Sequence, residues 1–402
     1  MSKEYCLPPA KFSLFLMSLA LCCLLFTACG SSGSANAPHP SDPLHSKVET
    51  SSGQDRDSSS QTIDSSTGLS SGGDEDDIPS DSLPPAEGMV RSHLTNEWVS
   101  EDIGNSRPLA VIIPNESAAL PHYNLSKASV VYEANVEGRM TRLMALFEDW
   151  ESLNKIGNIR SLRAYYAYWA LEWDAFIVHW GGPYFINEVL DKPNVQSLNG
   201  ETPQDSVAFF RSDDRKDPHN AYANGESLRA LILQKDYSLS NRGFADETHY
   251  QFAEESAPNT LEQYQSATTA SFIDMSSCYP LTRCYFKYNE ADGLYYRYQH
   301  LSGSSDSPHV DGATGQQLSF KNVLVQFTKH EELGEGYLAF QCHDDTRDGY
   351  FFTNGKGIHV TWEKNSDFGA TRYYDENGNE IQLNTGRTMV LIVEDGDSFQ
   401  FE

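Results

Sequence analysis

Two arginines at the expected start of a helix point to an anion-binding site in the first half of the chain. Arg160 and Arg163 lie on either side of Ser161, just before an aromatic segment. Ser161 is a suitable N-cap, and cations at a helix N-terminus are unfavourable by about 0.3–1 kcal/mol each unless an anion is present. Guanidinium groups bind carboxylate or phosphate through paired hydrogen bonds. The motif therefore predicts an anion site, for which Arg142 and Arg211 are further candidates.

The same arginines could instead be neutralised within the protein. Glu133 and Glu137 lie close in sequence to Arg139 and Arg142, and the whole chain carries a net charge of −28. Such a chain offers many carboxylates that can form ion pairs with arginine. Internal ion pairs and an external anion are therefore alternative explanations of the motif.

Polar side chains near glycine and proline turns are the other candidates. His179 ends an apolar run just before a Gly-Gly pair, and ligands of open α/β sheets gather beyond the carboxyl ends of strands. A hydrogen-bonded core histidine is the alternative. His219 and Asn220 follow a proline, in a turn that a purely structural role would also explain. The candidate polar residues are His179, His219, Asn220, Glu137 and Asn115.

Sequence motifs of known catalytic centres are absent. The chain has no Gly-x-Ser-x-Gly, no His-Glu-x-x-His and no Gly-Lys-Ser phosphate-binding loop. Its cysteines and histidines lack zinc spacing, and its acidic turns lack the spacing of a calcium loop. We therefore expect neither a metal nor a cofactor, and whether the protein is an enzyme stays undecided.

Strands and helices alternate in residues 92–236, the segment that would position these side chains. The spacing of its aromatic residues predicts an amphipathic helix from Ser161 to Trp173, and a second helix is expected at 226–234. Apolar runs predict buried strands at 108–113, 130–135, 141–147 and 175–180. This alternation indicates a mixed α/β layered domain.

Residues 270–395 have a different pattern. Aromatic and β-branched runs recur between hairpin turn pairs such as Asn354-Gly355, and helical periodicity is scarce. They predict a mostly antiparallel β domain, reached through a polar connection at 237–269. The expected fold class is α+β: an N-terminal mixed α/β domain followed by a β-rich C-terminal domain.

The N-terminus has the features of a lipoprotein signal peptide. Residues 1–28 combine a basic start with an uncharged apolar stretch, and Cys29 follows a small residue. The segment resembles the lipobox of bacterial lipoproteins, which implies that the Cys29 thiol carries lipid and that acyl chains such as palmitate anchor the protein in the membrane. We therefore expect a cell-membrane protein, lipid-anchored on the extracytoplasmic face.

A spacer follows the lipidation site. Residues 29–91 are rich in Ser, Gly and Asp and contain no aromatic residue, so they cannot bury enough apolar surface to fold. A flexible chain of this length reaches roughly 45 Å. The acidity of the whole chain also opposes binding to nucleic acid, so we expect none as a partner.

Three cysteines lie in the globular part. Cys278 and Cys284 are close enough in sequence to close a small loop in an oxidising compartment, which would leave Cys342 unpaired. Three free, buried thiols are an equally good interpretation.

Motifs in both globular segments resemble the DUF3048 family, the lipoproteins of the YerB type. They include Ile156-Gly157-Asn158-Ile159-Arg160-Ser161-Leu162-Arg163 and His179-Trp180-Gly181-Gly182. The others are residues 107–115, 131–133, 136–142, 210–211 and 218–222 in the first segment, and 311–312, 322–323, 349–356 and 361–362 in the second. The resemblance implies a two-domain envelope lipoprotein and no established activity.

Two functions are compatible with these observations. The first is a binding or assembly factor for cell-wall components, such as a wall polymer or another envelope protein. The second is an extracytoplasmic transferase or hydrolase that acts on a phosphate- or carboxylate-bearing envelope polymer or precursor. Convergence of the arginines and His179 in an open cleft would favour a ligand site.

Overall fold

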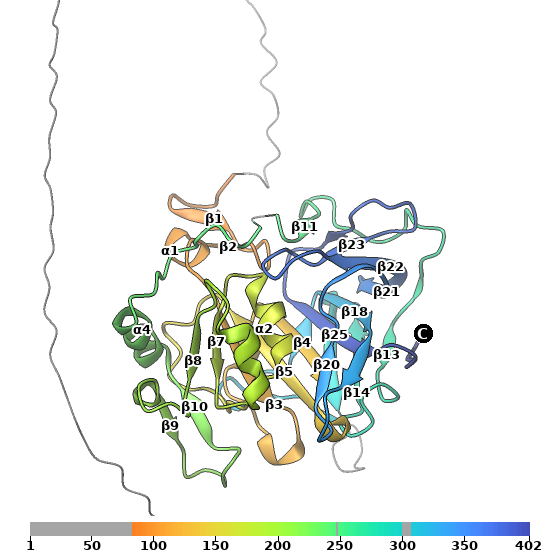
Figure 1. Cartoon of the computed structure of the whole chain (residues 1–402). Coiled ribbons are helices and arrows are strands. Elements are labelled where there is room, and N and C mark those ends of the chain that lie inside the picture. Colours follow the sequence, from red (N-terminus) through yellow and green to blue (C-terminus); the bar gives the residue numbers. More distant parts are fainter. Residues whose placement is uncertain (1–82, 247, 300–306) are drawn as a thin grey trace, which may run out of the picture. The chain divides into compact units, whose positions relative to one another are not determined.

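A large mixed β-sheet forms the centre of the folded part of the chain (Figure 1). The computed structural model describes residues 83–246, 248–299 and 307–402, so Cys29, the signal segment and most of the expected spacer lie outside the described residues. The central sheet has eleven strands, with the order β12-β22-β21-β18-β25-β4-β5-β3-β7-β8 and β23 paired to β22. Because sheet predominates and helices are few, the fold is α+β, as the sequence predicts.

The described elements fall into one large sheet, several small ones and short helices. The central strands are β3 (Leu109–Pro114), β4 (Val130–Asn135), β5 (Thr141–Phe147), β7 (Phe176–His179), β8 (Ser197–Asn199), β12 (Thr268–Thr269), β18 (Asn322–Thr328), β21 (Asp344–Thr353), β22 (Lys356–Lys364), β23 (Arg372–Tyr374) and β25 (Thr388–Glu394). A six-stranded sheet contains β13 (Phe272–Asp274), β14 (Cys284–Asn289), β15 (Leu294–Gln299), β16 (Ser307–Pro308), β17 (Ser319–Phe320) and β26 (Gln400–Phe401). The smaller sheets are β6 (Ile156–Gly157), β10 (Ala221–Ala223) and β9 (Phe209–Arg211); β1 (Met89–Arg91) and β2 (Trp98–Ser100); β11 (Gln251–Phe252) and β24 (Gln382–Leu383); and β19 (His330–Glu332) and β20 (Leu338–Phe340). The helices are α1 (Glu101–Gly104), α2 (Ala164–Leu171), α3 (Asn187–Leu190) and α4 (Gly225–Gln234), with 3₁₀ turns η2 (Ser117–Ala119), η3 (Leu125–Lys127), η4 (Glu137–Arg139), η5 (Tyr184–Ile186) and η6 (Ser206–Ala208).

The central sheet joins the two segments that the sequence analysis treats as separate domains. β4 from the first segment pairs in parallel with β25 from the second, with Tyr132 opposite Val390. β25 in turn pairs in parallel with β18. An edge strand exposes unpaired N–H and C=O groups, and this pairing removes one such edge from each segment. The described residues accordingly belong to one compact unit.

Both faces of the central strands are buried, and successive side chains enter different cores. Along β3, Val111 contributes to a core that includes α4 and the six-stranded sheet. Its neighbours Ala110 and Ile112 contribute to a core that includes α2. This alternation follows from the two-residue period of a strand. The continuous apolar runs of the sequence are therefore explained by strands with no solvent-facing side (Figure 1).

Helix α2 is shorter and more deeply buried than the sequence predicts. It begins at Ala164, with Arg163 as N-cap, and six of its eight residues are buried. Residues 160–162 are instead extended: the Arg160 N–H donates to the Ile112 carbonyl at 2.8 Å, and the Leu162 N–H to the Gly181 carbonyl at 3.0 Å. The expectation that Ser161 is the N-cap is therefore wrong, because its backbone lies between two strand ends.

The expected hairpin turns are confirmed in the second segment. Asn354 and Gly355 connect β21 to β22, with φ values of 49° and 72°. Such positive φ values suit Asn and Gly and fit the right-handed twist of the paired strands. Turn chemistry in the sequence thus identified this hairpin correctly.

Cys278, Cys284 and Cys342 are free and buried. The Cys278 Sγ donates to the Ser398 carbonyl at 3.4 Å, and burial raises the pKa of this thiol to about 12. No disulfide joins Cys278 to Cys284, so the second of the two interpretations holds.

Candidate anion-binding site

An open pocket of about 370 Å³ lies beside the N-terminal end of α2. Ligand pockets in proteins commonly span roughly 300–1,000 Å³. Three of the four arginines predicted from the sequence line it: Arg160, Arg163 and Arg211. The remaining lining residues are Ile159, Ser161, Trp180, Gly182, Pro183, Glu201, Asp217, Pro218 and Tyr337. The structure thus brings three of the predicted arginines to one pocket.

Backbone hydrogen bonds fix the segment that carries Arg160. Its N–H group donates to the end of β3, and its carbonyl accepts from the Trp180 N–H at 3.0 Å, just beyond β7. The chain therefore enters the pocket as an extended segment held on both sides by the central sheet. A site built on such rigid elements is better ordered than one on a free loop.

Glu137 neutralises Arg163. The Arg163 Nε donates to the Glu137 Oε1 at 2.7 Å, and its Nη2 to the Oε2 at 2.6 Å. Burial would lower the pKa of Arg163, but the Glu137 hydrogen bonds and charge raise it. Burial would likewise raise the pKa of Glu137, and Arg163 lowers it. The internal-pair explanation is therefore correct for this arginine.

Arg160 and Arg142 are not neutralised in the same way. Within the residues that the structure describes, neither guanidinium has a carboxylate oxygen within 4.0 Å, and the buried Arg160 Nε has no hydrogen-bond partner. Arg142 donates its Nη1 to the Ser161 carbonyl. Burial, and next the charge of Arg163, lower the pKa of Arg142 to about 10, and Arg160 adds to this effect. Of these two arginines, Arg160 lines the pocket, whereas Arg142 lies behind it and contacts the Ser161 backbone.

Arg211 is held by both an acidic and an aromatic side chain. It forms an ion pair with Asp217, and its Nη1 donates to the Asn220 Oδ1 at 2.7 Å. Its guanidinium carbon lies 4.4 Å from the centre of the Trp180 ring, within the range of a cation–π contact. Asn220, a candidate polar residue, therefore orients Arg211.

The two candidate histidines do not line the pocket. His179 ends β7 as expected but is fully buried, and its Nδ1 lies 2.8 Å from the Gly181 carbonyl. Burial lowers its pKa to about 4, so it is a neutral core residue. His219 lies in the adjoining loop, with its Nδ1 3.5 Å from the Glu116 carboxylate. Burial lowers the pKa of His219 below its usual value.

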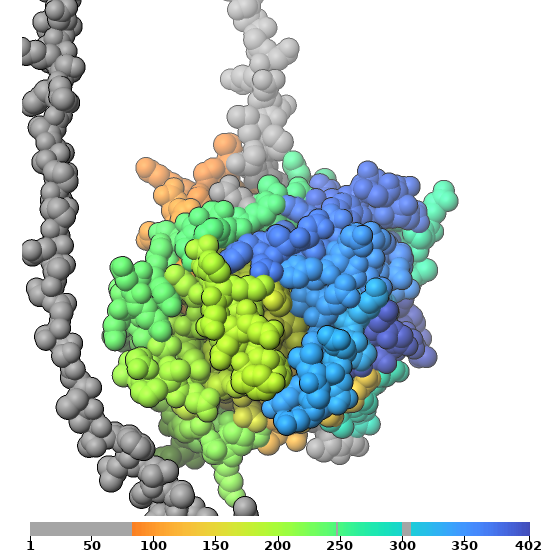
Figure 2. Space-filling view, viewed as in Figure 1, coloured from red at the N-terminus to blue at the C-terminus, as the bar shows by residue number. Residues whose placement is uncertain are grey.

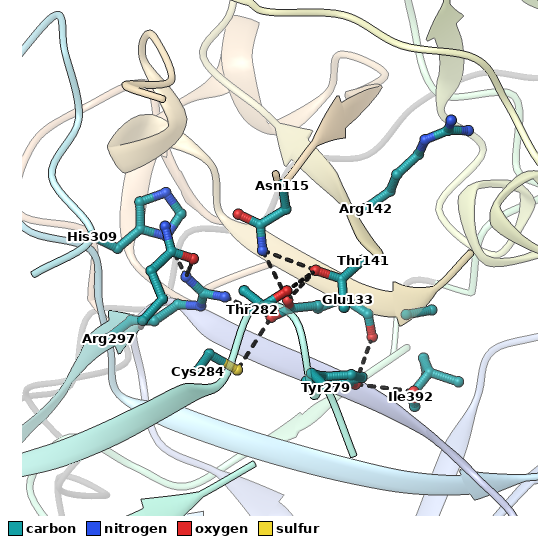
Figure 3. Close-up of polar contacts among 12 residues, drawn as sticks. Asn115, Glu133, Thr141, Arg142, Tyr279, Thr282, Cys284, Arg297, His309 and Ile392 are labelled. Atoms are coloured by element: carbon teal, nitrogen blue, oxygen red, sulfur yellow. Dashed lines mark hydrogen bonds and ion pairs between the residues drawn. The ribbon is translucent and has the colours of Figure 1, made fainter. Parts of the chain in front are cut away.

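Asn115 belongs to a second, fully buried polar cluster on the other side of the strands (Figure 3). Its Nδ2 donates to the Glu133 Oε1 at 2.9 Å, as does the Thr141 hydroxyl at 2.7 Å. The Arg297 Nη2 donates to the Glu133 Oε2 at 2.9 Å, and both partners are 0% exposed. Figure 3 shows Arg142 pointing away from this cluster, although it is the next residue after Thr141. Asn115 is therefore structural.

Sequence reasoning missed two residues of the pocket, Tyr337 and Glu201. Tyr337 comes from the second segment, at the tip of the β19–β20 hairpin, and lies 5.3 Å from the Arg163 guanidinium carbon. Glu201 follows β8, and its carboxylate lies against Gly181. No local motif marks either position, because only the packing of β20 on α2 and of β8 on β7 brings them to the arginines.

The comparisons with known proteins agree with this architecture. Residues 94–238 match the family described as "Protein of unknown function (DUF3048) N-terminal domain", and residues 275–390 match its C-terminal domain. The protein "Putative lipoprotein YerB" of Bacillus subtilis (strain 168) is 24% identical over 319 residues, which cover 79% of this chain and 90% of that protein. The crystal structure of YerB from Bacillus subtilis superposes with a TM-score of 0.65 at 23% identity, over 77% of this chain and 99% of that chain.

These matches place the chain in a class of sheet-rich α+β proteins in which the N-terminal and C-terminal family segments follow one another. The chain belongs to the DUF3048 family. Its relative YerB is named as a lipoprotein, which agrees with the lipobox-like segment that ends at Cys29. Among the described residues, no helix has the length and apolar character needed to span a bilayer.

Proposed function

We propose that this protein is a lipid-anchored binding or assembly factor of the bacterial envelope, and that its arginine pocket holds an anionic group of an envelope component. Acyl chains on Cys29 would keep it at the extracytoplasmic face of the membrane. The spacer would then let the pocket reach ligands several nanometres from the bilayer, since a flexible chain of this length spans roughly 45 Å.

The observation that carries the proposal is the state of Arg160. It lines an open pocket, its Nε is buried without a partner among the described residues, and Arg142 beside it also lacks a carboxylate. Arg160 is only partly buried, but a buried N–H group without a partner is costly, and this one occurs in a chain of net charge −28. An external anion in the pocket would pair with Arg160, in the paired geometry that guanidinium groups prefer.

The pocket favours binding over nucleophilic catalysis. Ser161 is its one hydroxyl-bearing aliphatic side chain. In the part of the chain that the structure describes, its hydroxyl makes no hydrogen bond to a histidine or carboxylate. An activated serine needs such a base. The absence of such a base argues against a serine nucleophile in the pocket, and we therefore place the binding factor ahead of the transferase or hydrolase.

Titration with inorganic phosphate tests the pocket. We expect phosphate to bind the wild-type chain and Arg160→Ala to weaken binding about tenfold or more, since a charged hydrogen bond contributes roughly 1.5–3 kcal/mol. Arg229→Ala is the matched control, because Arg229 is a half-exposed arginine of α4, paired with Glu151. Equal affinities of Arg160→Ala and the control would refute the proposed site.

Membrane fractionation tests the anchor separately. We expect the wild-type chain in the membrane fraction with an acylated N-terminal cysteine detectable by mass spectrometry, and the Cys29→Ala variant without acylation. An unmodified thiol in a membrane-free wild-type protein would refute the anchoring part of the proposal and leave the pocket unaffected.

A further inference from the structure

We infer that the ligand of the arginine pocket is a sugar that carries an anionic group, a sugar phosphate or a uronic acid. This inference rests on the proposed anion site and deepens it. It uses two features of the pocket that a site for a bare anion would not need: an aromatic rim and an unpaired carboxylate.

Aromatic rings extend from the pocket to the surface. Tyr337 lines the pocket, and Phe185 packs edge-on against it with ring centroids 5.1 Å apart. Tyr184 packs edge-on against Phe185 at 5.5 Å and is 85% exposed. In Figure 2 the light-blue surface of the β19–β20 hairpin lies directly against the yellow-green surface of α2 and the segment after it. The anionic end of a ligand at Arg160 would therefore lie beside an aromatic strip.

An exposed tyrosine next to a polar pocket suits the ring of a sugar. Tyrosine offers an apolar face and a polar tip at a small conformational cost. A sugar ring has the matching properties, with C–H groups on its faces and hydroxyl groups at its edge. A bare phosphate has no C–H surface and would gain nothing from Tyr184.

The carboxylates of the pocket also indicate a ligand with hydroxyl donors. Glu201 and Asp217 line the same cavity as the arginines. Asp217 pairs with Arg211, whereas Glu201 has no ion-pair partner among the described residues. A carboxylate repels a simple anion, but it accepts strong hydrogen bonds from hydroxyl groups. Glu201 therefore fits a sugar hydroxyl.

The volume of the pocket sets the size of the ligand. About 370 Å³ lies near the lower end of the range for small-molecule sites. One sugar with its anionic group fills such a space, and a longer polymer would continue across the exposed tyrosine. The open side of the pocket allows either a free sugar phosphate or a unit within a glycan chain.

Competing ligands separate this inference from the proposed function. We would titrate the full chain with inorganic phosphate, glucose 1-phosphate, glucuronate and glucose. We expect one of the two anionic sugars to bind at least about tenfold more tightly than phosphate, which corresponds to one good charged hydrogen bond. The tighter of the two identifies the anionic group as phosphate or carboxylate, and glucose alone should bind weakly.

Two variants test the parts of the pocket that would hold the sugar. Glu201→Ala and Tyr184→Ala should each lower the ratio of sugar-phosphate to phosphate affinity by about threefold to tenfold, and Glu201→Ala should raise the affinity for phosphate itself. Both side chains are exposed, so neither change should impair folding. Glu188→Ala on α3 is the control, because Glu188 is exposed and does not line the pocket.

Each outcome has a distinct meaning. Equal affinities for phosphate and both anionic sugars would overturn the inference while leaving the anion site intact. An unchanged affinity ratio in both variants would also overturn it. Failure of every anion to bind would refute the anion site itself.

Discussion

Arg297 and Arg160 lie in the same molecule in opposite surroundings. Arg297 is 0% exposed and paired with an equally buried Glu133, whose other oxygen accepts from Asn115 and Thr141. Arg160 lines an open pocket, and its buried Nε has no partner among the described residues. The first arginine connects the six-stranded sheet to the central sheet. The second forms no ion pair among the described residues, which leaves it available for the anion that we propose.

The difference follows from how well each arginine is enclosed by acidic and polar side chains. Burial would lower the pKa of Arg297, but Glu133 raises it, so the charge is retained in the interior. Arg142, the pocket's buried neighbour, has no carboxylate oxygen within 4.0 Å among the described residues, and burial and then the charge of Arg163 lower its pKa to about 10. The Nε atoms of Arg297 and Arg160 are both buried without a hydrogen-bond partner among the described residues, so the two arginines differ in charge pairing: Arg297 has the Glu133 carboxylate, and Arg160 has no carboxylate oxygen within 4.0 Å in the described part of the chain.

Breaking the buried pair should have the largest effect on stability. Glu133→Ala leaves the Arg297 charge unpaired in the interior, so we expect the free energy of unfolding to fall by about 3–5 kcal/mol. Chemical denaturation measures this loss. The double variant Glu133→Leu with Arg297→Met removes both charges and should recover most of the stability. A single-variant loss below about 1 kcal/mol would contradict our description of the cluster.

Glu148 is a buried carboxylate that forms no ion pair with the residues that the structure describes. Burial raises its pKa to about 7, although Ser92 donates a hydrogen bond to it at 2.7 Å. The folded state therefore retains a proton that the unfolded chain loses above about pH 4.5, and the stability of the wild type falls as the pH rises from about 4.5 to 7. We expect Glu148→Gln to stabilise the protein by up to about 3 kcal/mol at pH 8.

The gain from Glu148→Gln should disappear near pH 3.5, about one unit below the unfolded-state pKa, because the wild-type carboxyl is then largely protonated in both states. Urea denaturation at both pH values measures the difference. Asp213→Asn, at an exposed carboxylate, should show no such pH dependence. The same gain at both pH values would mean that the charge of Glu148 is not its cause.

Two neighbouring arginines of the pocket should differ in their effect on stability. Arg163→Ala leaves the half-buried Glu137 without its two hydrogen bonds, so we expect a loss of about 1–2 kcal/mol. Arg160→Ala breaks no internal pair and should change the free energy of unfolding by no more than about 0.5 kcal/mol. Equal losses in the two variants would show that Arg160 also has a structural role.

Removing the Asp217 carboxylate, which competes with an external anion for Arg211, should have the smallest effect on stability. It should also strengthen anion binding. Asp217 is 69% exposed in its pair with Arg211, and exposed pairs contribute less than about 1 kcal/mol. We expect Asp217→Asn to keep the stability of the wild type and to bind inorganic phosphate about threefold more tightly, since like charges repel. Weaker phosphate binding would imply that Asp217 mainly orients Arg211.

Several elements were predictable because their signals are local. Continuous apolar runs identified β3, β4 and β5, and the Asn354-Gly355 pair identified the β21–β22 hairpin. The start of α2 was not predictable, since Ser161 has the residue type of an N-cap but lies in an extended segment held by Ile112 and Gly181. The hydrogen bonds of this segment to the central sheet outweighed the preference of serine for the N-cap position.

The candidate site was predictable in part, because some of its residues belong to one local motif. The arginine motif identified Arg160 and Arg163, and the pairing of Arg163 with Glu137 was one of the two alternatives. His179 has the expected position at a strand end, but its side chain enters the core. The apolar run before His179 predicts a strand end, but it does not tell whether the histidine side chain faces a ligand site or the core. Sequence reasoning therefore could not decide between these two orientations.

Local sequence features were enough to identify the buried strands, the hairpin turns, the lipobox-like N-terminus and the arginine motif of this acidic chain. These properties depend on neighbours within a few residues. The pairing of β4 with β25, the approach of Tyr337 to the pocket and the set of arginines without carboxylate partners became visible only in the folded chain. Those outcomes depend on contacts between residues far apart in the chain, where burial and charge pairing are set by packing.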